Sequence, residues 1–225
     1  MLQITKDIWI WAAQRNILLE KITLLQTTYH EWKLNDSVFV AICKTFFQPD
    51  IDLFATRINT QLERFVSWFL DPEAVASDAF SIGWNKFLAY IFPLFSIIQR
   101  VLQKIEEEKV SIALLIIPMW ITQPWYPRLL NCLVDMLRKL LFRKHLLMLI
   151  HNNQAHPMNK RKLFLIACTV PGDLLKIEEF QNSLKKLFFN HEEPPLQKSI
   201  TINGENCHFG VINGKLIPLL PLTFN

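Results

Sequence analysis

Two apolar segments joined by an amphipathic stretch constrain the fold of this chain more than any other feature. Residues 87–92 form a short apolar run, and residues 97–108 place apolar side chains on one face of a helix. Residues 111–117 then form an unbroken apolar run, which is typical of a strand buried on both faces of a parallel sheet. The order strand, loop, helix and strand predicts that the loop lies at the carboxyl edge of the sheet, where α/β proteins bind ligands.

The preceding sequence extends the same α/β pattern. Apolar residues repeat at helical spacing over residues 38–47, and Asn35 or Asp36 can cap that helix. Short runs over residues 50–55 and 65–70 are strand candidates.

We expect three regions in the chain. Residues 36–137 are predicted to form a Rossmann-like α/β domain with a mostly parallel sheet. Residues 1–33 are predicted to form a helical N-terminal segment, because apolar residues between positions 2 and 19 share one helical face. Beyond residue 138 the pattern weakens, and residues 138–225 are expected to form a basic, irregular tail.

Local signals predict several further elements. Ser96 can cap the helix that follows the loop, and Pro127 can begin the next helix. In the tail, residues 164–170 fit either a strand or a helix, and residues 177–189 have a helical pattern. Asn213-Gly214 suggests a hairpin.

Composition and motifs exclude several classes of function. The chain has 5 glycines and contains neither GxGxxG nor GxxxxGK[ST], so it lacks a dinucleotide fingerprint and a P-loop. It also lacks GxSxG, HExxH and zinc-ligand spacing, so a hydrolase or a metal site has no support. The four cysteines lack CxxC spacing, which favours reduced thiols inside the cell, in the nucleus or cytoplasm. The apolar run over residues 87–99 is shorter than the about 20 residues of a membrane span, so we expect no membrane partner.

Charge is unevenly distributed along the chain. Residues 1–135 carry 12 basic and 14 acidic side chains, whereas residues 136–225 carry 12 basic and 6 acidic side chains. A basic tail can meet the phosphates of DNA, RNA or anionic lipid. The basic residues are scattered, however, and this favours an ordinary solvated surface.

Three aspartates stand beside the predicted strands. Asp52 lies in or just after the first strand, Asp71 follows the second, and Asp78 precedes the third. Acids at the strand ends of a doubly wound sheet can accept hydrogen bonds from a ribose hydroxyl or an amine of a nucleoside ligand. Aspartates also cap turns at such places, and spacing alone favours this structural role.

The loop Phe92-Pro93-Leu94-Phe95 is the second candidate site. Pro93 fixes the backbone, so that carbonyls can receive an amine, and Phe95 can stack on a base swung out of a helix. An ordinary turn with two core phenylalanines explains the same residues. Trp120 and Trp125, after the next strand, can likewise stack on bases or simply cover the sheet edge.

Several of these segments resemble one family. They are Pro49 to Asn59, Phe65 to Trp68, Asp71-Pro72, Asp78 to Phe80, Trp84, Phe92 to Ser96, Leu115 to Trp120 and Gln123 to Trp125. In this order they are similar to the polyprotein of DIRS-like retrotransposons, transposable elements that integrate with a tyrosine recombinase. The resemblance spans roughly residues 31–135. It implies a segment similar to phage-type DNA N6-adenine methyltransferases, which follows reverse transcriptase and ribonuclease H in those elements.

The resemblance implies a role for each candidate residue. Such methyltransferases bind S-adenosylmethionine on a Rossmann-like sheet, and their reaction loop reads Asn or Asp, Pro, Pro, then Tyr or Phe. Here Phe92 occupies the amide position, Leu94 the second proline position and Phe95 the stacking position. Asp52 resembles the acid of the cofactor strand and Asp71 a ribose ligand, and Asp78 is grouped with them as cofactor-binding.

The phenylalanine at position 92 indicates that adenine methyl transfer has been lost. Its side chain has no acceptor, so one of two hydrogen bonds to the adenine amine is missing. By analogy with oxyanion-hole mutants, such a loss costs about 2.7–4 kcal/mol, or at least about a hundredfold in rate. We therefore expect a pseudoenzyme without catalytic residues. We expect no cofactor, except S-adenosylmethionine if the pocket survives.

The N-terminal segment predicts a second lost activity. Lys6 to Trp11 and Asn16-Ile17 resemble the last helix of the retroelement ribonuclease H. Residues 18–30 contain no Asp, so an acid that two-metal hydrolysis needs is missing. The predicted function is a truncated, inactive retrotransposon polyprotein fragment. The alternatives are a DNA- or RNA-binding module and a non-catalytic protein that self-associates through exposed apolar faces.

Overall fold

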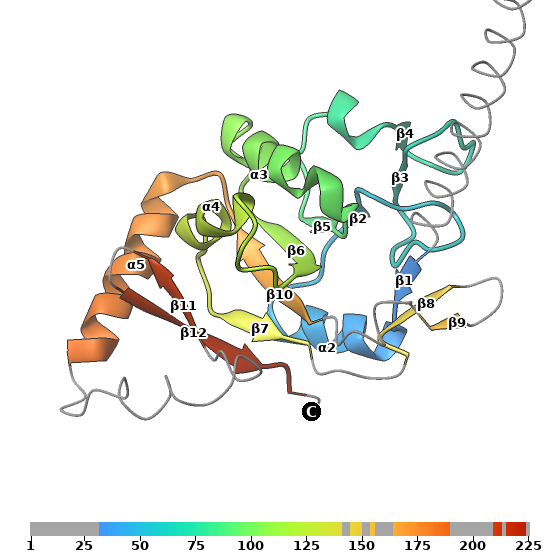
Figure 1. Cartoon of the computed structure of the whole chain (residues 1–225). Coiled ribbons are helices and arrows are strands. Elements are labelled where there is room, and N and C mark those ends of the chain that lie inside the picture. The colour runs from blue at the N-terminus through green and yellow to red at the C-terminus, as the bar shows by residue number, and fades with distance from the viewer. Residues whose placement is uncertain are drawn as a thin grey trace, which may run out of the picture.

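The chain folds as an α/β protein around a central sheet (Figure 1). The computed structural model describes residues 32–140, 145–149, 154–155, 164–189, 209–212 and 215–223. The described residues contain four α-helices, and the fold class agrees with the sequence-based prediction. The N-terminal helix expected between residues 2 and 19, and nearly all of the predicted ribonuclease H remnant, lie outside the described residues.

Helices and strands alternate along much of the chain. The helices are α2 (Asp36–Thr45), α3 (Ile98–Glu107), α4 (Trp125–Asn131) and α5 (Leu174–Phe189), with 3-10 turns η1 (Ala79–Ser81) and η2 (Phe95–Ile97). The strands are β1 (Trp32–Leu34), β2 (Ile51–Asp52), β3 (Val66–Ser67), β4 (Ala76–Ser77), β5 (Ala89–Ile91), β6 (Ala113–Pro118), β7 (Leu137–Lys139), β8 (Leu147–Leu149), β9 (Gln154–Ala155), β10 (Leu165–Val170), β11 (Phe209–Ile212) and β12 (Lys215–Pro221).

The central sheet has the strand order β11-β12-β7-β10-β6-β5-β2. The strands β2, β5 and β6 pair parallel, and so do β7 and β12. The strand β10 is antiparallel to both β6 and β7, and β11 is antiparallel to β12. Five of the seven strands therefore point the same way, which makes the sheet mostly parallel, as predicted.

Two apolar clusters cover the two faces of this sheet. On β6, Ala113, Leu115 and Ile117 pack with residues of α3, α4 and α5, whereas Leu114 and Ile116 pack with α2. This alternation follows from the pleat, which points successive side chains to opposite faces. Figure 1 shows α3 and α4 on one side of the sheet and α2 on the other. The buried strand predicted from the apolar run is therefore β6.

The helix starts match the sequence to different degrees. Asn35 caps α2 as predicted, because its Oδ1 accepts a hydrogen bond from the backbone N–H of Ser37 at 3.0 Å. Ser96 is not the cap of α3. It lies inside η2, and α3 begins at Ile98 without a side-chain cap.

The start of α4 differs from the prediction by two residues. The helix begins at Trp125, with Pro124 in the N-cap position, and Pro127 is its third residue. A proline fits the first turn because the N–H groups there have no partner within the helix.

The sheet continues across the boundary expected at residue 138. The strand β7 spans this position, β10 lies between β6 and β7, and β12 pairs with β7. Ile166 and Cys168 of β10 belong to the same apolar cluster as β6. Buried strand pairing therefore ties the described part of the expected tail to the α/β core. Ile212 of β11 pairs with Lys215 of β12, which agrees with the hairpin predicted at Asn213-Gly214.

Two small sheets flank the central one. The strands β3 and β4 form a parallel pair, and β1, β8 and β9 form an antiparallel sheet beside α2. In the residues that the structure describes, every helix is too short or too polar to cross a lipid bilayer.

Candidate functional site at the carboxyl edge

Three neighbouring strands end at the same edge of the sheet. Since β2, β5 and β6 are adjacent and parallel, their carboxyl ends face the same side. Asp52 is the last residue of β2, the loop Phe92–Phe95 follows β5, and Trp120 follows β6. The fold therefore brings these three predicted elements to one edge.

Aromatic rings cover this edge. Phe95 packs edge to face against Trp120 with ring centroids 5.2 Å apart, and the ring of Phe92 lies 6.5 Å from that of Phe95. All three residues are half-buried and Pro93 is buried. Phe95 packs against both apolar clusters of the sheet, so the loop closes the end of the core. The side chains of the loop are apolar throughout and offer no hydrogen-bond acceptor.

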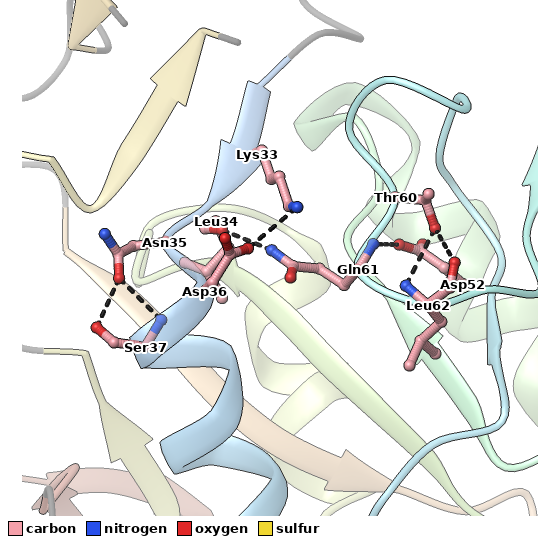
Figure 2. Close-up of polar contacts among 9 residues, drawn as sticks. All are labelled: Lys33, Leu34, Asn35, Asp36, Ser37, Asp52, Thr60, Gln61 and Leu62. Atoms are coloured by element: carbon pink, nitrogen blue, oxygen red, sulfur yellow. Dashed lines mark hydrogen bonds and ion pairs between the residues drawn. The ribbon is translucent and has the colours of Figure 1, made fainter.

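The carboxylate of Asp52 is buried and held by backbone amides. The residue is 2% exposed. Its Oδ1 accepts from the N–H of Phe54 at 3.3 Å, and its Oδ2 accepts from the N–H of Gln61 at 3.1 Å. Figure 2 shows the bond to Gln61. The two amides wrap residues 53–61 around the carboxylate, so both of its oxygens are used within the protein.

The surroundings of Asp52 disfavour its charged form. Burial raises the pKa of Asp52 to about 7, and the hydrogen bonds from Gln61 and Phe54 and the charge of Lys33 offset this only in part. Its register partner on β5 is Tyr90, which is 1% exposed. Among the described contacts, the Tyr90 hydroxyl makes no hydrogen bond. Burial, with smaller contributions from Asp52 and Cys43, raises the pKa of Tyr90 well above its usual range, so the phenol stays neutral.

The other two predicted carboxylates have local partners. Asp78 is exposed and caps η1, and its Oδ1 accepts from the N–H of Phe80 at 2.9 Å. Oδ1 of Asp71 accepts from the N–H of Glu73 at 3.1 Å, and its Oδ2 lies 3.7 Å from Nε of Arg57. The bonds from Phe80 and Glu73 are turn caps of the kind that spacing alone favoured, and the ion pair with Arg57 is an additional contact of Asp71.

The two predicted tryptophans differ in accessibility. Trp125 is 6% exposed and lies in the first turn of α4, where it packs 5.9 Å from Tyr126 within the core. Trp120 is half-buried and contacts the loop through Phe95. Of the pair, Trp120 therefore borders the carboxyl edge with part of its ring open.

Two amide side chains that the sequence interpretation did not single out connect this site to β1. Nε2 of Gln61 donates to the carbonyl of Leu34 at 2.5 Å, as Figure 2 shows, and Nδ2 of Asn59 donates to the carbonyl of Trp32 at 3.4 Å. The only sequence feature that points to these two amides is the polar stretch that begins at Thr56. This stretch predicts a turn, but it does not predict that the turn contacts β1.

A separate open groove of about 830 Å³ lies at the amino end of β6. Glu106 and Cys132 are among its lining residues. Glu106 accepts two hydrogen bonds from Arg128, at 2.8 and 2.5 Å, and the Cys132 Sγ donates to it at 3.2 Å. Burial first, then Glu106, raise the pKa of Cys132 to about 12, so its thiol is not a nucleophile.

Over the described ranges, no three His, Cys, Asp or Glu side chains are grouped as a metal site requires. No protein-family model, curated protein or solved structure matches the chain. The residues of the carboxyl edge are therefore the basis for inferring function.

Proposed function

We propose that the chain derives from a retrotransposon polyprotein and that its α/β domain is a degenerate DNA adenine methyltransferase-like domain that does not transfer methyl groups. The observation that carries this proposal is the aromatic carboxyl edge of β5 and β6. Phe92 stands where the resemblance requires an amide or acid, Phe95 packs beside it, and Trp120 packs against Phe95.

The lack of an available acceptor supports the loss of activity. A methyltransferase of this kind must hold an amino nitrogen while a methyl group is transferred to it. The benzyl side chain of Phe92 cannot accept a hydrogen bond. The carboxylate of Asp52, at the end of the next strand, already accepts from Phe54 and Gln61. Without a preorganised acceptor the transition state loses about 2.7–4 kcal/mol of stabilisation.

The acid of the predicted cofactor strand does not fit S-adenosylmethionine as it stands. Asp52 is 2% exposed, and both of its oxygens accept hydrogen bonds from the loop that covers it. Asp78 caps η1 through Oδ1, and Asp71 accepts from the backbone of Glu73 through Oδ1, while its buried Oδ2 accepts no hydrogen bond among the described contacts. Because a ribose hydroxyl cannot reach the buried carboxylate of Asp52, we propose that this domain works without the cofactor.

A methyl-transfer assay tests the proposal. Full-length protein is incubated with labelled S-adenosylmethionine and adenine-containing DNA, beside an unrelated active adenine methyltransferase as the positive control. We expect incorporation no higher than that of heat-denatured protein. Robust incorporation by the wild-type chain that disappears in Phe95→Ala would overturn the proposal.

A nucleic-acid-binding module is the second candidate. The half-buried rings of Phe95 and Trp120 at the carboxyl edge favour it, because base stacking on aromatic side chains contributes about 1–3 kcal/mol per base. Binding of single- and double-stranded DNA is measured as the salt concentration rises. Affinity that falls steeply with salt and weakens in Trp120→Ala supports this function. Binding that is absent at low salt excludes it.

A further inference from the structure

The groove at the amino end of β6 lies where two turns meet. One turn connects α3 to β6, and the other connects β10 to α5. The N–H of Gly172 donates to the carbonyl of Val110 at 2.7 Å, and a Cβ at position 172 would lie 2.6 Å from Cα of Lys109. The two turns therefore contact each other through their backbones. Trp120 follows the other end of β6, so the groove is separate from the carboxyl edge.

The walls of the groove are largely apolar. Pro171, Leu174 and Ile177 line it on the side of α5, and Cys132 lines it at the end of α4. Leu174 is 73% exposed, although covering a leucine side chain is favourable. The volume of about 830 Å³ falls within the range of about 300–1,000 Å³ that is usual for sites of small organic ligands. A small apolar body can therefore fill the groove and cover Leu174.

The two acids of the groove are compensated within the protein. Glu106 accepts two hydrogen bonds from the guanidinium group of Arg128, which neutralises its charge. Oδ1 of Asp173 accepts from the N–H of Leu175 at 3.0 Å, at the start of α5. The partial positive charge at the first turn of that helix offsets the charge of Asp173. The groove therefore presents little uncompensated negative charge to a ligand.

The two lysines of the groove lack such partners. In the part of the chain that the structure describes, neither Lys109 nor Lys176 forms an ion pair. Nζ of Lys176 donates to the carbonyl of Ser111 at 3.3 Å, which places this ammonium group beside the turn that carries Lys109. An ammonium group has three donors, so Lys176 can also contact an anion while it keeps that bond. Uncompensated positive charge thus borders an apolar groove.

We propose that this groove binds an amphiphilic anion, a small molecule with an apolar body and one carboxylate or phosphate group. Lys109 and Lys176 pair with the anionic group, and the apolar body packs on Leu174, Ile177 and Pro171. Carboxylate and phosphate both present charged oxygen acceptors to ammonium groups, and the experiment distinguishes the two. Because the groove lies away from the carboxyl edge, this binding does not depend on the proposed function.

Calorimetric titration of the full chain tests the site with four probes, which are octanoate, octyl phosphate, uncharged octanol and inorganic phosphate. We expect saturable binding of octanoate, octyl phosphate or both. Octanol lacks the charge and inorganic phosphate lacks the apolar body, so each should bind at least about tenfold more weakly. Hexanoate, which is two methylene groups shorter than octanoate, should also bind about tenfold more weakly.

Three results would overturn the proposal. The first is a dissociation constant weaker than about 10 mM for both octyl anions. The second is octanol that binds as tightly as the octyl anions, because the lysines then contribute nothing. The third is inorganic phosphate that binds as tightly as octyl phosphate, because the apolar walls then contribute nothing.

Variants at exposed positions locate the bound anion. Lys109→Gln and Lys176→Gln keep a polar side chain but remove one charge, and each should weaken binding of the octyl anion about threefold to tenfold. Leu174→Ala should weaken it by at least about threefold, because the apolar wall is smaller. Lys86→Gln is the matched control, since Lys86 is exposed and does not line the groove, and it should leave the affinity unchanged. Affinity that is the same in the wild-type chain and in both groove lysine variants would contradict the site.

Discussion

The rings of Phe95 and Trp120 meet edge to face with their centroids 5.2 Å apart, although the residues belong to loops after two different strands. This contact links the loop after β5 to the end of β6 at the edge where α/β proteins bind ligands. Packed aromatic rings thus close this edge.

The contact between Phe95 and Trp120 should be measurable as a coupling energy. In a double-mutant cycle of Phe95→Leu and Trp120→Leu, we expect an interaction of about 0.5–1.5 kcal/mol beyond the sum of the single effects. The free energies of unfolding come from urea denaturation of the four proteins. Effects that add within about 0.3 kcal/mol would show that the rings do not stabilise each other.

The stability of the whole domain should depend on the protonation of Asp52. Its pKa is about 7 in the folded state and near about 4 when unfolded, so the folded state holds the proton between these values. The free energy of unfolding should therefore fall as the pH rises from about 4 to 7, by up to about 1.4 kcal/mol per unit, and then stay level. The quantity to measure is the difference in unfolding free energy between wild type and Asp52→Asn at several pH values. A difference that does not vary with pH would contradict this prediction.

Gly172 should be intolerant of any side chain. A Cβ there would lie 2.6 Å from Cα of Lys109 and 2.7 Å from the backbone nitrogen of Val110. We expect Gly172→Ala to lower the free energy of unfolding by about 1–3 kcal/mol, since backbone atoms cannot yield as a flexible side chain does. Gly83→Ala is the matched control, because its nearest new neighbour would be at an ordinary distance of 3.6 Å. Equal effects of the two substitutions on thermal unfolding would refute the prediction.

Glu108 should stabilise the fold more than its neighbour Glu107. Oε2 of Glu108 accepts from the N–H of the buried Trp84 at 2.6 Å, and its Oε1 pairs with Lys104 at 2.5 Å. Glu108→Ala leaves that amide without its acceptor, which costs about 1–3 kcal/mol. Glu107→Ala removes an exposed carboxylate that accepts from Gln103, and should change stability by less than about 0.5 kcal/mol. Chemical denaturation of both variants provides the comparison, and indistinguishable midpoints would be inconsistent with this role.

The sequence was enough to predict those elements that depend on contacts between residues close together in the chain. The strand β6 is predictable because its residues form an unbroken apolar run, and the structure buries all six. The start of α2 is predictable because Asn35 can accept a hydrogen bond from its own first turn. The prediction that Ser96 caps α3 was wrong. A 3-10 turn, held by the N–H of Ile97 donating to the carbonyl of Leu94 at 3.1 Å, precedes that helix and makes a serine cap unnecessary.

Contacts between distant residues limited the prediction of the site. Asp52 was predictable as an acid at a strand end, but its burial depends on a loop that returns through Gln61 and reaches β1 at Leu34. The insertion of β10 between β6 and β7 likewise depends on pairing across more than forty positions, such as Ile166 with Ile117. Periodicity carries no information about such partners, and for this reason the sheet was expected to end near residue 138.

The central proposal is that the α/β domain folds but no longer binds S-adenosylmethionine. Calorimetric titration of the full chain with S-adenosylmethionine at neutral pH tests this most directly. Because Asp52 is buried and both of its oxygens accept hydrogen bonds within the protein, we expect no saturable heat, corresponding to a dissociation constant weaker than about 1 mM. Saturable binding at lower concentrations that Asp52→Asn weakens and Asp50→Asn leaves unchanged would contradict the loss of the site.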